Sequence, residues 1–231
     1  MILELTVDGK TPGRLSFPVK KMINAGFAAR DQEAVRQHME ELRRQGVTVP
    51  TTTPTYYPVV ADRITTASEI EVVGEHTSGE VEYVVLCAGD DIYVGVGSDH
   101  TDRKLEEHSI LLSKQICPNV ISPQVWPYRE VEEGWDDFIL RAWVVKEGKR
   151  TLYQEARLAT LMRPEELLER VREVVDGGLE GAVIFSGTVP TLGGAAIFAD
   201  RFQGELVDEA ARRSLSCSYF VRPIRWFKGE V

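Results

Sequence analysis

Paired cysteines are missing from this sequence of 231 residues. Its three cysteines, Cys87, Cys117 and Cys217, are odd in number and widely spaced, and no CxxC pair occurs. Disulfide frameworks and structural zinc sites need paired or closely spaced cysteines, so the spacing argues against both. Cys87 and Cys217 lie in or beside strand-like runs, which predicts inert core thiols at both positions.

Long apolar runs and clusters of positive charge are also missing. No run approaches the roughly 18 residues that a membrane-spanning helix needs, and the N-terminal segment lacks the layout of a signal peptide. The formal net charge is −9, whereas nucleic acids and anionic membranes reward clustered Lys and Arg. We therefore expect a cytoplasmic protein without nucleic-acid or membrane partners.

Several common catalytic and nucleotide-binding motifs are absent as well. The sequence contains no GxSxG elbow, no Walker A loop and no GxGxxG fingerprint. These absences argue against a serine hydrolase with a nucleophile elbow, a P-loop enzyme and a dinucleotide-binding enzyme. Any chemistry has to come from another arrangement of side chains.

Strand-like segments dominate what is present, in a chain long enough for one sizeable core or for a main domain with a small appendage. Two helices are predicted at residues 30–45, with Asp31 as N-cap, and at 164–175, with Pro164 in the first turn. The pattern predicts a β-rich α+β fold, with an N-terminal region over 1–65 and a main domain over 66–231. The predicted strands are residues 1–7, 69–73, 81–86, 92–96, 138–146, 151–156, 182–185, 205–207 and 214–221.

Two glutamates stand two residues apart at the head of an apolar, β-branched run. In a strand, positions i and i+2 point to the same face, so Glu80 and Glu82 are expected to project together. Asp99 follows a second strand-like run over 91–96. Three convergent carboxylates on neighbouring strands suit Mg²⁺, Mn²⁺ or Ca²⁺. The alternative is that Glu80 and Glu82 mark the solvent face of an edge strand.

A histidine and a glutamate three residues apart, His38 and Glu41, share one face of the first predicted helix. A carboxylate beside an imidazole raises its basicity, which suits a general base. The alternative is an ordinary exposed pair. Lys114 is a lone cation beside an apolar run, able to neutralise an anionic substrate or an enolate, unless it is a surface lysine.

Neutral hydrogen-bonding groups complete the candidates. Gln154 and Thr188 are two of them, and Gly187 allows a tight turn whose N–H groups bind an anion, although structural turns also explain such sequences. His76 precedes the glutamate pair and either lines the same cleft or is a plain loop histidine. His100 is excluded from a shell with Asp99, because adjacent strand residues point apart.

The order of these motifs resembles the fumarylacetoacetate hydrolase superfamily, and in particular its divergent bacterial branch DUF2848. The resemblance covers most of the chain, from about His38 to the C-terminal strands. Its motifs are the His38–Glu41 dyad, the Glu80–Glu82 pair and the segments at 98–105, 113–118, 146–154 and 181–188. Asp99 follows Glu82 more closely than in most members of the superfamily, as though an intervening helix were missing, and Val189 interrupts the usual Gly-Thr-Pro turn.

The resemblance implies a twisted β-roll with a small N-terminal lid region, a homodimer, and Mg²⁺ or Mn²⁺ at the base of a cleft. It implies that Glu80, Glu82 and Asp99 are the metal ligands. It assigns catalytic roles to Lys114 and to the pair formed by His38 and Glu41, which would activate water once the lid closes. The residues assigned to substrate binding are Gln154, Thr188, Arg103 and His76.

The predicted function is that of a metal-dependent hydrolase. Its substrate is expected to be a small 2-oxo or 1,3-dicarbonyl carboxylate, cleaved at a carbon–carbon bond through a stabilised enolate. The resemblance also admits a decarboxylase, a hydratase or an isomerase, because fold does not choose among these reactions. A catalytically silent small-molecule binding protein on the same scaffold is the alternative from another class.

Overall fold

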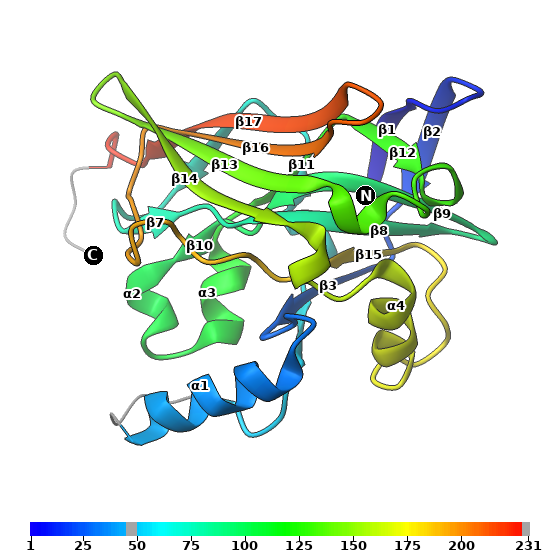
Figure 1. Cartoon of the computed structure of the whole chain (residues 1–231). Helices are drawn as coiled ribbons and strands as arrows, with labels where there is room; N and C mark the ends of the chain where they lie inside the picture. Colours follow the sequence, from blue (N-terminus) through cyan, green and yellow to red (C-terminus); the bar gives the residue numbers. More distant parts are fainter. Residues whose placement is uncertain (45–49, 228–231) are drawn as a thin grey trace.

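The computed structural model of this chain describes residues 1–44 and 50–227, apart from the side chains of residues 38 and 41–43. Two stacked β-sheets form the centre of the described structure. Figure 1 shows β13, β14, β16 and β17 above β8, β9, β15 and β3, with α1, α2 and α3 below them. The predicted β-rich α+β fold is confirmed.

The larger sheet has ten strands in the order β2-β1-β12-β9-β8-β15-β3-β4, with β11 pairing with both β9 and β5. Its centre is β8, which pairs antiparallel with β9 on one side and with β15 on the other. Its strands are β1 (Ile2–Val7), β2 (Gly13–Pro18), β3 (Lys21–Gly26), β4 (Thr55–Val59), β5 (Ile64–Thr65), β8 (Val81–Ala88), β9 (Asp91–Ser98), β11 (Asn119–Ile121), β12 (Gln124–Pro127) and β15 (Ala182–Phe185).

The smaller sheet has five strands in the order β14-β13-β16-β17-β6, and β7 pairs with β10 in a two-stranded ribbon. These strands are β6 (Glu69–Val72), β7 (Thr77–Ser78), β10 (Thr101–Asp102), β13 (Ile139–Lys146), β14 (Lys149–Arg157), β16 (Arg201–Asp208) and β17 (Arg213–Pro223). The helices are α1 (Gln32–Arg44), α2 (Arg103–Glu106), α3 (Ile110–Ile116) and α4 (Pro164–Arg172), with 3-10 turns η1 (Ala61–Arg63), η2 (Tyr128–Glu130), η3 (Trp135–Asp137) and η4 (Leu158–Thr160).

Burial explains why the two sheets have different sequence patterns. Strand β8 is covered on both faces, so Tyr83 and Val85 pack into one apolar cluster while Val84 and Leu86 pack into the other. Such a strand reads as a continuous apolar run. Strand β16 alternates strictly between buried and partly exposed residues, because only one of its faces meets the core.

Local signals account for the two predicted helices. The carboxylate of Asp31 accepts hydrogen bonds from the backbone N–H groups of Glu33 and Ala34 at 3.1 and 3.0 Å, so the predicted N-cap of α1 is confirmed. Helix α4 starts at Pro164 and ends at Arg172 rather than at the predicted residue 175. The C-terminal end predicted for α1, at residues 45 and 46, lies outside the described residues.

The strands of the first 65 residues belong to the larger sheet, together with strands from later in the chain. Strand β3 pairs in parallel with β15, and β1 pairs in parallel with β12. The division of the chain at residue 65 stays a prediction. None of the described helices is both long and apolar enough to cross a membrane.

A core truncation tests the packing between the sheets. Leu206 of β16 is fully buried in the cluster that joins them, whereas Leu192 is 60% exposed. We expect Leu206→Ala to lower the free energy of unfolding by about 2–5 kcal/mol, because it leaves a cavity. Leu192→Ala should change it by less than about 0.5 kcal/mol. Urea unfolding measures both, and equal losses would contradict this packing.

Candidate metal and substrate site

The three predicted carboxylates meet where β8 begins and β9 ends. Antiparallel pairing sets Glu82 opposite Gly97, and the backbone N–H of Asp99 donates to the carbonyl of Glu80 at 3.1 Å. One ligand oxygen from each of Glu80, Glu82 and Asp99 lies within 4.8 Å of the other two. The structure therefore brings together the whole predicted ligand set.

Burial overturns the edge-strand interpretation of the glutamate pair. Strand β8 lies between β9 and β15, and Glu82 is 1% exposed while Asp99 is fully buried. Glu80 is only partly exposed, with 21% of its side chain accessible. Carboxylates are almost never fully buried without a partner, so this cluster needs compensating groups.

Three different groups compensate the carboxylates. The ammonium of Lys114 on α3 pairs with Asp99, and the guanidinium of Arg103 pairs with Glu80 at 3.2 Å. Glu82 accepts a hydrogen bond of 2.8 Å from the backbone N–H of Gly187. Gly187 has a left-handed φ of 83°, which a residue without a Cβ adopts freely.

Electrostatics show that the cluster still lacks positive charge. Burial, followed by the charge of Asp99, holds the pKa of Glu82 well above its ordinary value. Burial alone lowers the pKa of Lys114, but Asp99, Glu80 and Glu82 together raise it above its usual range. Three carboxylates face two cations, so one carboxyl is driven towards its neutral form.

A hard divalent cation fits this donor set. Carboxylate oxygens are the ligands that Mg²⁺, Mn²⁺ and Ca²⁺ prefer, and the three oxygens already converge. A dication would supply the missing positive charge and keep Glu82 ionised, because a nearby opposite charge favours the charged form. The prediction that Glu80, Glu82 and Asp99 bind metal rests on this fit.

A cavity of about 430 Å³ opens beside the carboxylates. Of the predicted site residues, Glu80, Glu82, Lys114, Gln154 and Thr188 line it. Sequence reasoning missed other lining residues, among them Phe27, Tyr57, Glu106 and Ile110. No motif marks these four positions, since they come from separate segments that only the folded chain brings together.

Helix α3 shows how strongly the cluster controls its surroundings. It buries Lys114 to 5% exposure while leaving Leu111 and Leu112 at 39% and 54%. This reverses the ordinary order, in which lysine is exposed and leucine is buried. The attraction between Lys114 and the carboxylates explains the orientation of the helix, and the surface-lysine interpretation is wrong.

Gln154 and Thr188 tie the loop that follows β15 to the start of β8. The Gln154 amide nitrogen donates to the Thr188 hydroxyl at 2.8 Å and to the Val189 carbonyl at 2.5 Å, while its amide oxygen accepts from the Val81 N–H at 3.1 Å. The Thr188 hydroxyl donates to the Val81 carbonyl at 2.8 Å. Both residues line the cavity, and their contact with substrate stays a prediction.

The other two predicted substrate-binding residues lie outside the cavity wall. Arg103 links Glu80 to Glu106 and Ser78, with bonds of 2.8 and 2.7 Å to the latter two, so it lies behind the ligand cluster. His76 is exposed, and its ring packs edge-on against Phe198 at 5.2 Å. Substrate contact by Arg103 and His76 stays a prediction.

His100 is buried, and neither of its ring nitrogens bonds to the Asp99 carboxylate. Its two ring nitrogens hydrogen-bond to the hydroxyls of Tyr219 and Thr77, each at 2.9 Å. Burial lowers the pKa of His100 to about 3, so the ring is neutral. The sequence-based exclusion of His100 from a shell with Asp99 agrees with this placement.

The predicted general base His38 and its partner Glu41 belong to α1, whose backbone spans Gln32–Arg44. The side chains of His38 and Glu41 lie outside the described residues, so their catalytic roles stay predictions.

The three cysteines, Cys87, Cys117 and Cys217, are free and buried. This agrees with the core thiols predicted at Cys87 and Cys217.

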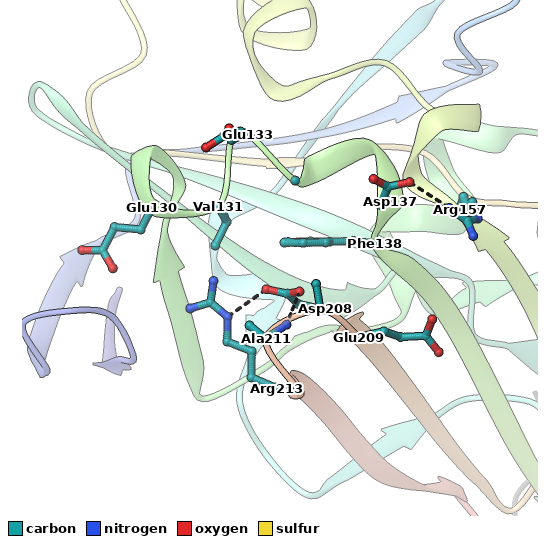
Figure 2. A pocket seen from close by; sticks show the side chains of 12 residues that line it. Glu130, Val131, Glu133, Asp137, Phe138, Arg157, Asp208, Glu209, Ala211 and Arg213 are labelled. Atoms are coloured by element: carbon teal, nitrogen blue, oxygen red, sulfur yellow. Dashed lines mark hydrogen bonds and ion pairs between the residues drawn. The ribbon is translucent and has the colours of Figure 1, made fainter.

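A second cavity, of about 640 Å³, contains none of the predicted site residues. Figure 2 shows that two of its carboxylates pair with its two arginines, whereas Glu130, Glu133 and Glu209 have no partner among the residues drawn. Asp208 accepts from Arg213 at 3.1 Å, and Arg157 donates to Asp137 at 2.8 Å. The converging and mostly buried carboxylates Glu80, Glu82 and Asp99 lie at the other cavity, which is therefore the better candidate for a functional site.

Sequence comparison gives one family. The profile of the family described as "Protein of unknown function (DUF2848)" matches residues 25–219. None of the curated proteins compared with the chain matches it.

Three solved structures with the same fold are informative. Cg1458 with an inhibitor has a TM-score of 0.65 at 17% identity, covering 93% of this chain and 81% of its own. The 2-keto-3-deoxy-D-arabinonate dehydratase complexed with magnesium and 2,5-dioxopentanoate has a TM-score of 0.63 at 14% identity, and the match covers 91% of this chain and 75% of the dehydratase chain. Yeast ynq8, a fumarylacetoacetate hydrolase family protein, has a TM-score of 0.61 at 15% identity, and the match covers 92% of this chain and 96% of the ynq8 chain. The predicted fumarylacetoacetate hydrolase-like fold is confirmed.

Removing one carboxylate tests the metal site. We expect Glu82→Gln, which keeps an acceptor for Gly187, to weaken Mn²⁺ binding by more than about 100-fold, since even residues that only support a ligand cost 10–100-fold. Titration calorimetry measures the affinity. Glu133→Gln, in the cavity of Figure 2, is the matched control and should bind as the unmodified protein does. Equal affinity for all three proteins would contradict the site.

Proposed function

The chain belongs to the family described as "Protein of unknown function (DUF2848)", and from this premise we propose that it is a divalent-metal-dependent enzyme acting on a small 2-oxo or 1,3-dicarbonyl carboxylate. The observation that carries the proposal is the buried convergence of Glu80, Glu82 and Asp99 beside a cavity. Buried carboxylates that lack enough positive charge are costly, and such groups cluster at functional sites.

The solved structures of this fold support the choice of substrate class. One of them, the dehydratase, was crystallised with magnesium and 2,5-dioxopentanoate, which is itself a 2-oxo carboxylate. Mg²⁺ or Mn²⁺ is therefore the proposed cofactor, and Ca²⁺ remains compatible with the oxygen ligands.

In this proposal, different side chains bind the metal, stabilise the negative charge of the substrate and position the loop after β15. A bound Mg²⁺ or Mn²⁺ would polarise a carbonyl next to a carboxylate and lower the energy of the enolate. Lys114 holds Asp99 in place and puts a fixed positive charge on the cavity wall, where it favours an anionic substrate. Gln154 and Thr188 fix the loop that presents the Gly187 N–H to Glu82.

His38 is the proposed general base, with Glu41 orienting it. Both lie on α1, whose N-cap Asp31 and first-turn residue Ala34 line a cavity that shares residues with the candidate site. In the proposed hydrolase, His38 takes a proton from a water molecule, whose oxygen attacks the substrate carbonyl. The carbon–carbon bond then breaks, which gives one carboxylic acid fragment and one enolate fragment, and the enolate carbon takes the proton back from His38. The general base contributes most when its pKa lies near the working pH.

The second candidate function is that of a lyase. One protein with this fold is a dehydratase by name, and elimination uses the same enolate stabilisation without hydrolytic attack. Decarboxylation and isomerisation stay open for the same reason. A cytoplasmic homodimer is proposed from the resemblance to the superfamily and from the composition of the chain.

Oxalate, which mimics the enolate of pyruvate, tests the proposal directly. We expect it to bind with Mn²⁺ present, to lose that binding when the metal is removed by chelation, and to fail to bind Asp99→Ala, because a ligand is missing. Asp137→Ala, in the cavity of Figure 2, is the control and should bind normally. Calorimetry with and without metal is the measurement. No binding with Mg²⁺, Mn²⁺ or Ca²⁺ would overturn the proposal.

Loss of the base tests the catalytic part. We expect His38→Ala to lower turnover of any identified substrate by about 10²–10⁴-fold, the usual contribution of a general base, while metal-dependent oxalate binding persists. His108→Ala removes an exposed histidine and should leave turnover unchanged. Full turnover in His38→Ala would exclude it as the base.

A further inference from the structure

A third cavity, distinct from the one in Figure 2 and larger than the cavity beside the carboxylates, adjoins the candidate site. Its volume is about 640 Å³, and Phe27, Ala29 and Pro190 line both it and the cavity that holds the carboxylates. We name it the apolar annex. Beyond the shared residues, its apolar wall consists of Ala34, Val35, Ala156 and Ala159. The annex lies between the start of α1 and the end of β14, and the three shared residues border both hollows.

The polar side chains of the annex are already engaged. The Arg30 guanidinium donates to both carboxylate oxygens of Asp136 at 2.9 and 2.7 Å and to the Leu161 carbonyl at 3.0 Å. Asp31 caps α1. The Thr160 hydroxyl donates to the Arg157 carbonyl at 2.8 Å. The annex therefore offers a ligand hydrocarbon contacts and no uncompensated cation.

The boundary between the two cavities is held in an uncommon conformation. Phe27 has a left-handed φ of 54°, which a bulky residue seldom adopts. The Gln32 amide nitrogen donates to the carbonyls of Phe27 and Ala29 at 3.0 and 2.7 Å, so the turn is braced. Such outliers persist only where the surroundings hold them, and they gather at ligand sites.

We infer that the substrate of this enzyme carries an apolar substituent, a hydrocarbon chain or ring, which lies in the annex while its oxo-carboxylate end lies at Glu80, Glu82 and Asp99. The inference rests on the proposed function and adds the chemistry of the distal end of the substrate. A second carboxylate at that end would meet only Arg30, whose charge Asp136 already neutralises. Dicarboxylates are therefore disfavoured.

N-alkyl oxamates test the inference, because they keep adjacent carboxylate and carbonyl oxygens while the chain varies. With Mn²⁺ present, we expect N-hexyloxamate to bind at least about tenfold more tightly than N-methyloxamate, since each fully buried methylene is worth up to roughly fourfold. N-(5-carboxypentyl)oxamate should show little of this gain. Titration calorimetry gives the affinity ratios.

Variants then place the chain in the annex. Ala159→Leu fills it from one wall and Ala34→Leu from the other, so each should bring the hexyl-to-methyl affinity ratio close to one. Ala211→Leu, in the cavity of Figure 2, makes the same substitution elsewhere and should leave the ratio unchanged. Because Ala159→Leu and Ala34→Leu fill the annex independently, the test still holds if one of these two variants fails to fold.

The outcomes separate the two proposals. If N-methyloxamate does not bind with metal, the proposed function fails and the inference fails with it. If N-methyloxamate binds but N-hexyloxamate binds no more tightly, the inference alone is overturned. A chain-length gain that survives both Ala159→Leu and Ala34→Leu also overturns it, since the chain then lies elsewhere.

Discussion

Mutual repulsion among three carboxylates packed into the core is the constraint around which this site is built. Glu82 and Asp99 are almost completely buried, and Glu80 lies beside them. Unpaired charge in such a place is costly, and the neighbouring structure supplies several forms of compensation. It turns Lys114 inward from α3, sets Arg103 behind Glu80 and directs a backbone N–H at Glu82. Each of these contacts places a positive charge or a hydrogen-bond donor against one of the carboxylates.

The two sheets hold these groups with little freedom to relax. Strand β8 is paired on both sides and buried on both faces, so Glu82 cannot turn towards solvent without breaking the centre of the core. The loop after β15 is fastened to β8 through Gln154 and Thr188. Close-packed protein interiors have low compressibility and transmit strain. A preformed set of converging oxygens is the consequence, and it suits a hard cation that would complete the charge balance.

The cavities beside the carboxylates divide according to chemistry. Charged and hydrogen-bonding groups line the part next to Glu80 and Glu82, whereas the apolar annex beyond Phe27 presents hydrocarbon. The scaffold is the part shared with Cg1458, the dehydratase and ynq8. Since one fold supports many reactions, the side chains around the cluster, rather than the sheets, have to account for substrate choice.

Local patterns in the sequence were sufficient for the nine predicted strands, the N-cap at Asp31 and the same-face pairing of Glu80 with Glu82, because these depend on residues close along the chain. They did not predict other strands of the larger sheet, such as β2, β3 and β12. Lys114 was recognised as a candidate, but α3 was not predicted, since that helix buries its lysine and exposes its leucines. Only the tertiary structure decided that β8 is central rather than an edge, that Arg103 backs Glu80, and that Phe27 and Ala159 border one hollow. These relations join segments far apart in sequence, where no local period carries information and long-range strand pairing sets the neighbours.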